Sequence, residues 1–290
     1  MLFSYLDSFI HIIYCDNMNK RKIIINILWL IIWSIMIILI VYSKTNKDTI
    51  LVMNNANISS TIVYRVNDDK ILYQNNIHQK MLPASLTKIL TALVAYKYLD
   101  INQIVRINDE MINVVGSRIY LEKDDLIKVE DLLYGMILQS GNDAAKALQY
   151  AYSNNPLDFI SKMNEEVINL GLENSQFENT TGLDEKEYNY TTTYDFAIIT
   201  KELLKYDYLK TLIGIKKHHI LMDNKKITVT HKHKLLYNDN FMIGGKTGYT
   251  KKAGRTLVSV YEKGEEQIII VTFNVSNDWN VHRNLATKFL

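Results

Sequence analysis

The stretch Pro83-Ala84-Ser85-Leu86-Thr87-Lys88 opens an apolar run that continues to Tyr98, and the rest of the fold is organised around it. Proline is tolerated in the first turn of a helix, where its missing N–H would have no partner, so a helix is predicted to begin beside Ser85. Lys88 follows three residues later, a spacing that places both side chains on one helix face. A serine hydroxyl is a weak nucleophile until a base lies within hydrogen-bond reach, and this lysine provides one. The pattern alone is common at helix N-termini, so it needs support from the rest of the chain.

Two later stretches supply that support. Ser140-Gly141-Asn142 follows the apolar run from Leu132 to Leu138, and Lys246-Thr247-Gly248 follows Gly244-Gly245 and leads into Tyr249. Ser-x-x-Lys, Ser-Asp-Asn and Lys-Thr-Gly together are the motifs of serine β-lactamases and penicillin-binding proteins. The same order occurs here, with glycine in the middle of the second motif. Three short patterns in this order make a chance match improbable.

On these residues the chain resembles the serine D-alanyl-D-alanine carboxypeptidases, the low-molecular-mass penicillin-binding proteins of the peptidase S11 type. The resemblance covers about residues 56 to 290. It implies an α+β fold of the β-lactamase/transpeptidase type, in which an antiparallel sheet is covered by helices and a mostly helical region carries Ser140. Further stretches that share the family pattern are Lys80 to Lys88, Val129 to Met136, Gln139 to Ala145, Leu170-Gly171-Leu172, Thr193-Tyr194-Asp195 and Lys246 to Thr250.

Hydrophobic spacing predicts elements that agree with this fold. Two β-hairpins are expected, one from Ser60 to Arg65 with Lys70 to Gln74, the other from Arg255 to Tyr261 with Gln267 to Asn274. Phe241 to Tyr249 is the predicted strand that carries Lys246. Strands at both ends with helices between them favour an antiparallel sheet covered by helices. The expected helices are Ile89–Tyr98, Val129–Leu138, Ala144–Tyr152, Phe159–Leu170 and Tyr194–Tyr206.

The resemblance implies a catalytic role for three residues. Ser85 would attack the penultimate carbonyl of a peptide ending in D-Ala-D-Ala and form an acyl-enzyme. Lys88 would take the serine proton, which requires a neutral amine although a free lysine has a pKa of about 10.4. Burial and the nearby cation of Lys246 would both lower that pKa. Ser140 would relay a proton to the departing amine.

The remaining motif residues are implied to bind the substrate. Asn142 would hold the peptide chain and also bond the amine of the catalytic lysine. Lys246 and Thr247 would grip the terminal carboxylate, and Gly248 would let the strand approach the ligand closely. The backbone N–H of Tyr249, with that of the catalytic serine, would form the oxyanion hole. The implied partners are peptidoglycan stem peptides ending in D-Ala-D-Ala, with β-lactam antibiotics as covalent inhibitors.

Composition excludes several other classes of protein. The 290 residues are 48% hydrophobic and 22% charged, which suits one sizeable folded domain. A net charge of only +2 gives no reason to expect a nucleic acid partner. The single cysteine, Cys15, leaves no intrachain disulfide and no thiolate metal site. His231 and His233 would share a face of a strand near His218-His219, but a metal site needs further ligands, so we expect no metal and no cofactor.

Residues 23 to 41 form an almost unbroken apolar run, close to the roughly 20 residues that a membrane-spanning helix needs. Lys20-Arg21-Lys22 precedes the run, which predicts a cytoplasmic N-terminus. A cleaved signal peptide is the alternative, although the run exceeds the usual apolar region of about 7–15 residues and no Ala-x-Ala site follows. Either Met1 or Met18 is compatible with the true start. We therefore expect a cytoplasmic tail over residues 1–22, a signal anchor in the cell membrane over 23–42, a linker over 43–55 and an extracellular peptidase domain over 56–290.

Two other functions remain open. A serine β-lactamase shares the motifs but hydrolyses its acyl-enzyme with a glutamate acting through a water, and Glu165-Glu166-Val167-Ile168-Asn169 offers a similar pattern inside a predicted helix. A non-catalytic penicillin or cell-wall sensor would keep the fold without turnover. His231-Lys232-His233-Lys234 stands where relatives commonly carry asparagines, which leaves the substrate preference open.

Overall fold

The computed structural model describes residues 29–37, 58–184, 188–222 and 225–290. The chain divides into two compact units, Met1–Leu51 and Val52–Leu290. In the first unit, residues 29–37 are helical and their side chains are exposed. Among the described residues, no helix combines the length and the apolar character that crossing a membrane requires. The predicted tail over 1–22, the linker over 43–55 and most of the predicted anchor over 23–42 lie outside the described residues.

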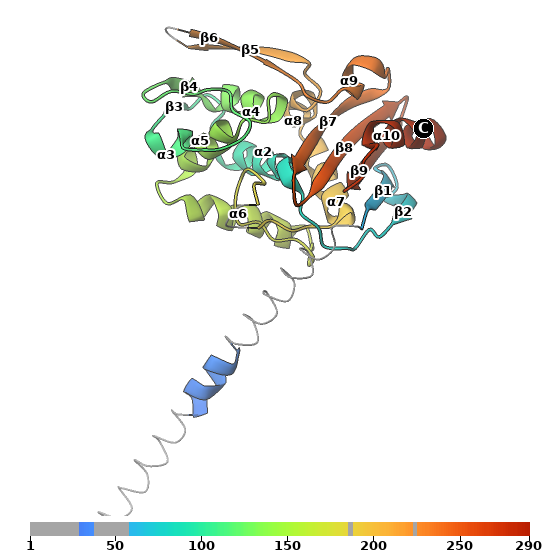
Figure 1. Cartoon of the computed structure of the whole chain (residues 1–290), viewed down its shortest axis with the longest axis horizontal. Coiled ribbons are helices and arrows are strands. Elements are labelled where there is room, and N and C mark those ends of the chain that lie inside the picture. The colour runs from blue at the N-terminus through green and yellow to red at the C-terminus, as the bar shows by residue number, and fades with distance from the viewer. Residues whose placement is uncertain (1–28, 38–57, 185–187, 223–224) are drawn as a thin grey trace, which may run out of the picture. The chain divides into compact units, whose positions relative to one another are not determined.

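The second unit contains a five-stranded antiparallel sheet with the strand order β2-β1-β9-β8-β7 (Figure 1). Both predicted hairpins are confirmed, because β1 pairs with β2 and β8 pairs with β9. The two hairpins join where β1 pairs with β9, so the beginning and the end of the domain share one sheet. The strand with Lys246 lies at the edge of the sheet. The bounds are β1 Ser60–Arg65, β2 Lys70–Asn75, β7 Met242–Thr250, β8 Gly254–Lys263 and β9 Glu266–Phe273.

The five predicted helices are present, and their bounds are α2 Thr87–Tyr98, α4 Val129–Leu138, α5 Asn142–Tyr152, α6 Pro156–Asn169 and α7 Thr193–Leu204. Hydrophobic spacing did not predict the remaining elements, most of which have three to six residues and are too short to show a period. These are η1 Ala84–Leu86, β3 Ile104–Arg106, α3 Asp109–Ile112, β4 Leu126–Lys128, α8 Asp207–Leu212, β5 Lys217–Met222, β6 Lys225–Thr230, α9 Leu235–Asn238 and the longer α10 Asp278–Phe289.

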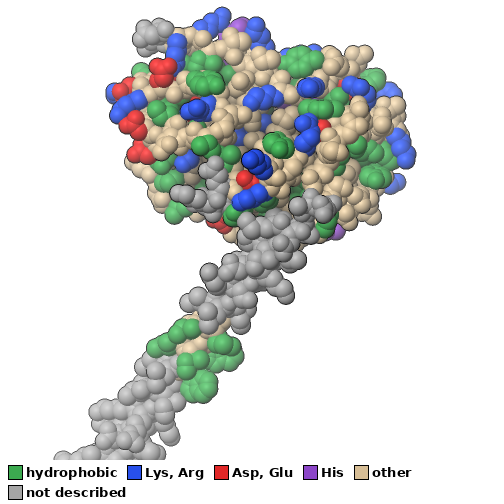
Figure 2. Space-filling model, in the orientation of Figure 1, with side chains coloured by type: hydrophobic (Ala, Val, Ile, Leu, Met, Phe, Trp, Pro, Cys, Tyr) green, Lys and Arg blue, Asp and Glu red, His purple; other side chains and the backbone are tan. Residues whose placement is uncertain are grey.

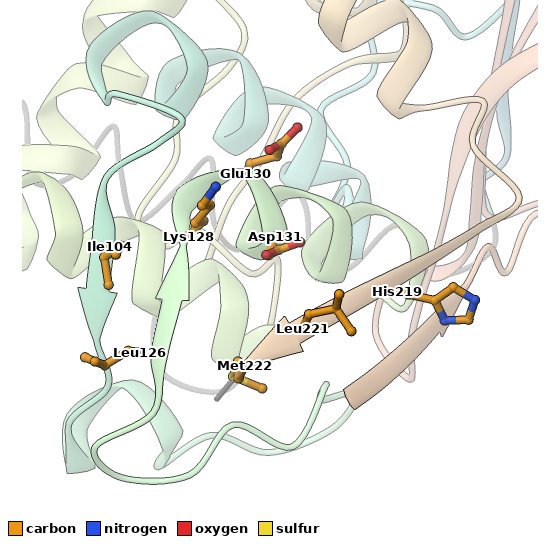
Figure 3. Close-up of a pocket in the computed structure, with 8 residues that line it drawn as sticks. All are labelled: Ile104, Leu126, Lys128, Glu130, Asp131, His219, Leu221 and Met222. Atoms are coloured by element: carbon orange, nitrogen blue, oxygen red, sulfur yellow. The ribbon is translucent and has the colours of Figure 1, made fainter. Parts of the chain in front are cut away.

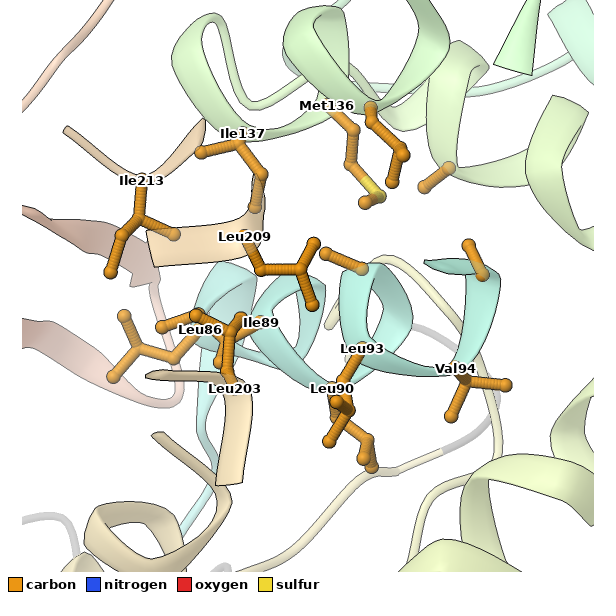
Figure 4. Packing of buried hydrophobic residues seen from close by; sticks show 14 of the residues in the cluster. Leu86, Ile89, Leu90, Leu93, Val94, Met136, Ile137, Leu203, Leu209 and Ile213 are labelled. Atoms are coloured by element: carbon orange, nitrogen blue, oxygen red, sulfur yellow. The ribbon is translucent and has the colours of Figure 1, made fainter. Parts of the chain in front are cut away.

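Helix α2 lies at the centre of the domain and is buried on every side from Thr87 to Ala95. Figure 4 shows Ile89 and Leu93 on this helix among side chains from other helices, such as Met136 on α4 and Leu209 on α8. A helix that is apolar all round is typical of a protein core. Each fully buried leucine or isoleucine stabilises such a core by about 1.5–3 kcal/mol. The helix that begins beside Ser85 is therefore also the main structural element of the core.

The sheet is covered on both faces, which explains why strand β9 reads as a continuous apolar run. Ile269 and Val271 belong to the core cluster around α2, whereas Ile268 and Ile270 belong to a second cluster with residues of α10. Alternate side chains of a strand point to opposite faces, so both faces of β9 must be apolar. Helix α7 packs on the first face and α10 on the second.

Buried histidines bond to the sheet from the side of α10. His282 bonds the Ser259 hydroxyl through Nδ1 at 2.7 Å and the Thr272 hydroxyl through Nε2 at 2.9 Å. His233 bonds the same Ser259 hydroxyl through Nε2 at 3.0 Å. Its neighbour His231 accepts a bond from the backbone N–H of His233 at 3.1 Å. The expectation that His231 and His233 share a strand face is wrong, because they follow β6 in an irregular segment.

Burial is the main cause that lowers the pKa of all three histidines. The pKa of His233 falls to about 3, and those of His231 and His282 fall well below 6.5. The rings are therefore neutral at neutral pH. They hold the segment before β7 and helix α10 against the sheet by hydrogen bonds that use the neutral rings.

These histidines make the domain sensitive to acid. Because their pKa is lowered in the folded protein from about 6.5 in an unfolded chain, the unfolded state binds more protons below pH 6.5. Their full contribution to stability is present above pH 6.5 and is lost as the pH falls below it, by up to about 1.4 kcal/mol per pH unit for each histidine. For His233 this loss extends towards pH 3. Urea denaturation at several pH values should show this loss, and His282→Asn should reduce its slope. The exposed His78 serves as control: an equal change of slope in His78→Asn would contradict the assignment.

Candidate active site

Ser85 lies in the 3₁₀ turn η1, directly before α2, rather than in the first turn of α2 itself. Ala84 in this turn has a left-handed backbone, with φ of 49°. A second segment presses against the turn at Gly182, where an added Cβ would lie 1.8 Å from the Ala84 carbonyl oxygen. Only glycine fits this close approach, so the position of Ser85 depends on Gly182 as well as on its own helix.

Lys88 is the base that the sequence predicts, and the structure places it beside the serine. Its Nζ lies 3.0 Å from Ser85 Oγ and donates a hydrogen bond to the Thr181 carbonyl oxygen at 2.7 Å. The side chain is fully buried, and burial, followed by the cations of Lys246 and Lys232, lowers its pKa well below that of a free lysine. A neutral amine that donates to Thr181 keeps a lone pair that can accept the Ser85 proton.

Ser140 and Lys246 form a second pair. The Nζ of Lys246 donates to Ser140 Oγ at 2.9 Å and to the Thr247 carbonyl oxygen at 3.0 Å. Burial, and to a lesser degree the cation of Lys232, lowers the pKa of Lys246 to about 7. A group with this pKa gives and takes protons readily near neutral pH. The pair therefore suits a proton relay through the Ser140 hydroxyl.

Asn142 begins helix α5 and does not make the bond to Lys88 that we expected. Its Nδ2 donates to the Val115 carbonyl oxygen at 2.7 Å, and its buried Oδ1 has no hydrogen-bond partner among the residues that the structure describes. Lys88 instead donates to Thr181, a backbone acceptor that the motifs do not include. The predicted Asn142–Lys88 bond is corrected accordingly. The unpartnered oxygen of Asn142 remains available to an N–H group of a ligand.

Strand β7 brings the third motif against the serine. An added Cβ on Gly248 would lie 3.0 Å from the backbone nitrogen of Ser85 and 2.3 Å from Thr256 Oγ1. The strand pairs with β8 on one side and is terminal in the five-stranded sheet. On its other edge the backbone N–H of Gly245 donates to the Ile213 carbonyl oxygen at 3.0 Å, so an added strand could pair only with the part of β7 that follows Gly245. Tyr249 on this strand is 65% exposed. An extended peptide that pairs with β7 would therefore pass beside Ser85.

A hollow of about 210 Å³ adjoins this strand. Arg255 is held in it by Asp278, with its Nε 3.0 Å from Oδ2 and a terminal nitrogen 2.9 Å from Oδ1, and its guanidinium lies over the Trp279 ring. Because Asp278 is already paired with Arg255, the charges of Lys232 and Lys234 leave the hollow with a positive surplus, a net positive charge that favours an anion. Figure 2 shows Lys and Arg side chains spread over the middle of this face of the domain. The lining residues are Lys232, Lys234, Thr247, Gly248, Tyr249, Arg255, Thr256, Asp278 and Trp279.

A second hollow, of about 480 Å³, lies between the β3–β4 and β5–β6 ribbons (Figure 3). None of the motif residues lines it. Asp131, one of its carboxylates, is bonded to His218 Nε2 at 2.8 Å. The lining offers no activated nucleophile, so the candidate active site is the group of motif residues around Ser85. The lining residues are Ile104, Leu126, Lys128, Glu130, Asp131, His219, Leu221 and Met222.

The glutamates considered for a β-lactamase lie within α6, as the sequence predicts. Glu166 is buried and pairs with Lys97 at 2.7 Å, and Glu165 pairs with Lys162 at 2.6 Å. Both carboxylates are thus engaged in ion pairs that hold α6. Neither serves as a base beside Ser85.

The motifs did not reveal several residues that shape the site. Thr181 acts through its backbone carbonyl, which no side-chain pattern reports. Asp143 directly follows the second motif, and both of its carboxylate oxygens accept a bond from the backbone N–H of Ile119 at 3.0 Å. Lys232 precedes the third motif and belongs to none of the three motifs.

The comparisons with known proteins agree with this geometry. A family model described as D-alanyl-D-alanine carboxypeptidase, Peptidase S11, matches residues 46–277. The chain is similar to the D-alanyl-D-alanine carboxypeptidase DacF of Bacillus subtilis, with 34% identity over 223 residues that cover 75% of this chain and 57% of the relative. It is also similar to DacC of Escherichia coli, with 32% identity over 235 residues that cover 76% of this chain and 57% of the relative. The chain thus spans little more than half the length of these curated relatives.

Solved structures show the same fold. A D-alanyl-D-alanine carboxypeptidase of Mycobacterium tuberculosis has a TM-score of 0.70 and 25% identity, covering 74% of this chain and 81% of that chain. A DD-transpeptidase of Streptomyces has a TM-score of 0.69 and 27% identity, covering 74% of this chain and 89% of that chain. The predicted α+β architecture is confirmed.

The lowered pKa of Lys246 predicts a stability that depends on pH. Between the folded value of about 7 and the unfolded value of about 10.4, the unfolded state binds one more proton. The contribution of this lysine is fully present above pH 10.4 and is lost as the pH falls towards 7. Stability of the native protein relative to Lys246→Met should therefore rise by about 1.4 kcal/mol per pH unit from pH 7 to 10, measured by chemical denaturation. A difference that stays constant with pH would contradict this, and the exposed Lys128, changed to Met, is the control.

Proposed function

The chain belongs to the D-alanyl-D-alanine carboxypeptidase family, peptidase S11, and we propose that it removes the terminal D-alanine from peptidoglycan stem peptides through an acyl-enzyme on Ser85. The observation that carries the proposal is the amine of Lys88, buried and 3.0 Å from Ser85 Oγ, beside the edge strand β7, which can pair with an extended peptide beyond Gly245. A nucleophile, its base and a peptide-binding edge are the parts that acyl transfer needs.

Acylation begins when Ser85 Oγ attacks the carbonyl carbon of the penultimate D-alanine and its proton passes to Lys88. The negative charge that develops on the carbonyl oxygen is met by backbone N–H groups at Ser85 and Tyr249, a contribution of about 2.7–4 kcal/mol per donor. The C–N bond then breaks. The Lys246–Ser140 pair delivers a proton to the departing amine, and D-alanine leaves. Water hydrolyses the ester in the second half of the reaction.

The charges of the hollow beside Thr247 suit a substrate that ends in a carboxylate. The terminal carboxylate would be held by the Thr247 hydroxyl and by the positive surplus of the hollow that contains Arg255. The Nζ of Lys246 is buried and bonded to Ser140, so its cation supports the same carboxylate through the field it adds to the site. The open oxygen of Asn142 would accept an N–H of the peptide.

A β-lactam imitates the D-Ala-D-Ala amide and should acylate the same oxygen. We expect a fluorescent penicillin to label the protein covalently and Ser85→Ala to abolish the label, because Ser85 carries the hydroxyl that bonds to the Lys88 amine, whereas the other oxygen bonded to this amine is the backbone carbonyl of Thr181. Gel fluorescence with mass spectrometry of the modified peptide measures this. Undiminished labelling of Ser85→Ala would contradict the assignment. Ser161→Ala, at an exposed serine of α6, is the matched control and should label fully.

Turnover separates the proposal from its two alternatives. A carboxypeptidase releases D-alanine from a short peptide ending in D-Ala-D-Ala, whereas a sensor takes up penicillin and releases nothing from the peptide. A β-lactamase would hydrolyse the penicillin rapidly. Class A β-lactamases use a glutamate that acts through a water to hydrolyse the acyl-enzyme. Glu165 and Glu166 are held in ion pairs within α6 and do not serve in that role.

We further propose that the apolar run over residues 23–42 anchors the protein in the cell membrane with the catalytic domain outside. The run and the basic residues before it support this orientation. Protease added to intact spheroplasts should remove the domain and spare the N-terminal tail, as detected with antibodies against each part. A protected domain would contradict the orientation. Release of the domain into the medium without protease would instead indicate a cleaved signal.

A further inference from the structure

The loop over residues 113–121 lies against the second motif and is attached to it by backbone bonds. Asp143 accepts from the backbone N–H groups of Ile119 at 3.0 Å and Leu121 at 3.2 Å. The backbone N–H of Asn142 donates to the Ser117 carbonyl oxygen at 2.8 Å. The loop therefore rests on the first turn of helix α5, which carries a residue of the substrate site.

The same loop sets the orientation of the Asn142 side chain. Its Nδ2 donates to the Val115 carbonyl oxygen at 2.7 Å, and the side chain is 3% exposed. With the nitrogen fixed on an acceptor, the oxygen of the amide must point the other way, where it has no partner. A buried acceptor without a donor is costly, and a peptide N–H that reaches it recovers that cost. Binding of the peptide thus depends on where the loop holds this amide.

Lys232 attaches the loop from another part of the chain. Its Nζ donates to Ser117 Oγ at 2.9 Å, and its backbone N–H donates to the Leu138 carbonyl oxygen at 3.2 Å. The backbone of Lys232 is thereby fixed next to the second motif, while its side chain reaches the outer side of the loop. Lys232 also lines the hollow beside Thr247, so its contact with Ser117 lies next to that hollow.

We propose that Lys232 is a positioning residue for the reaction: through Ser117 it holds the loop over residues 113–121 in place, and the loop holds the Asn142 amide in the orientation that receives the peptide. The inference rests on the proposed function for the identity of the substrate. The contact between Lys232 and Ser117 is independent of that function.

A purely electrostatic role for Lys232 is the alternative. Its cation helps to lower the pKa of both Lys88 and Lys246, although burial is the larger cause in each case. The two roles separate experimentally, because Ser117→Ala removes the contact and keeps the charge. Lys232→Met removes both, and Lys232→Arg keeps the charge and retains donors for the Ser117 hydroxyl.

The experiment compares Lys232→Met, Ser117→Ala, the double variant and Lys232→Arg with the native full-length protein. We expect each single change to raise KM for a D-Ala-D-Ala peptide about tenfold while kcat stays within about twofold. The double variant should be no worse than the more affected single variant, because both changes remove one contact. Lys232→Arg should restore most of the affinity. The control is Lys226→Met, since Lys226 is exposed on β6, does not line the hollow, and has no bond to this loop in the described part of the chain.

Amide hydrogen exchange supplies a readout that does not depend on turnover. Exchange over residues 113–121 should be faster in Lys232→Met and in Ser117→Ala than in the native protein and in Lys226→Met. Unchanged exchange in these two variants would overturn the proposal, as would a large KM effect of Lys232→Met with none for Ser117→Ala. Additive effects in the double variant would also overturn it. If the native protein releases no D-alanine, the proposed function fails and the positioning role falls with it, while exchange still reports whether Lys232 holds the loop.

Discussion

The burial of the Lys88 amine between Ser85 Oγ and the Thr181 carbonyl is the interaction on which the rest of the site depends. A buried ammonium is unfavourable, so burial itself supplies the neutral base that the serine needs. Lys88 lies in the first turn of α2. It is buried because α2 runs through the centre of the core, where other elements surround even this first turn. The catalytic chemistry and the stability of the core therefore share one helix.

This arrangement opposes stability. In an unfolded chain at neutral pH, Lys88 and Lys246 are both protonated. Folding must remove the proton from Lys88 and lower the pKa of Lys246. The apolar side chains packed around α2 and on both faces of the sheet offset that cost. The domain keeps two buried lysines at a cost in stability, which is the pattern expected of a functional site.

The sequence predicted what local spacing and motifs encode. The spacing of Ser85 and Lys88, both hairpins and five of the longer helices follow from periodicity and from the three motifs, whereas helix α10, with 12 residues, was not predicted. The acceptor at Thr181 was not predictable, because it is a backbone group that tertiary contact brings to the lysine. The predicted bond from Asn142 to Lys88 failed for a related reason: the loop that binds the Asn142 amide is distant in sequence, and no motif reports its conformation.

Three segments that are far apart in the chain meet at the turn that carries Ser85. Strand β7 approaches at Gly248, the segment before residue 184 approaches at Gly182, and α2 continues from the turn itself. At both glycines an added Cβ would meet backbone atoms of the turn, so a side chain at either position would displace the turn or the segment that packs on it. The geometry of Ser85 is consequently a property of the whole domain, and mutations distant from the motifs can change the reaction by shifting any one of these segments.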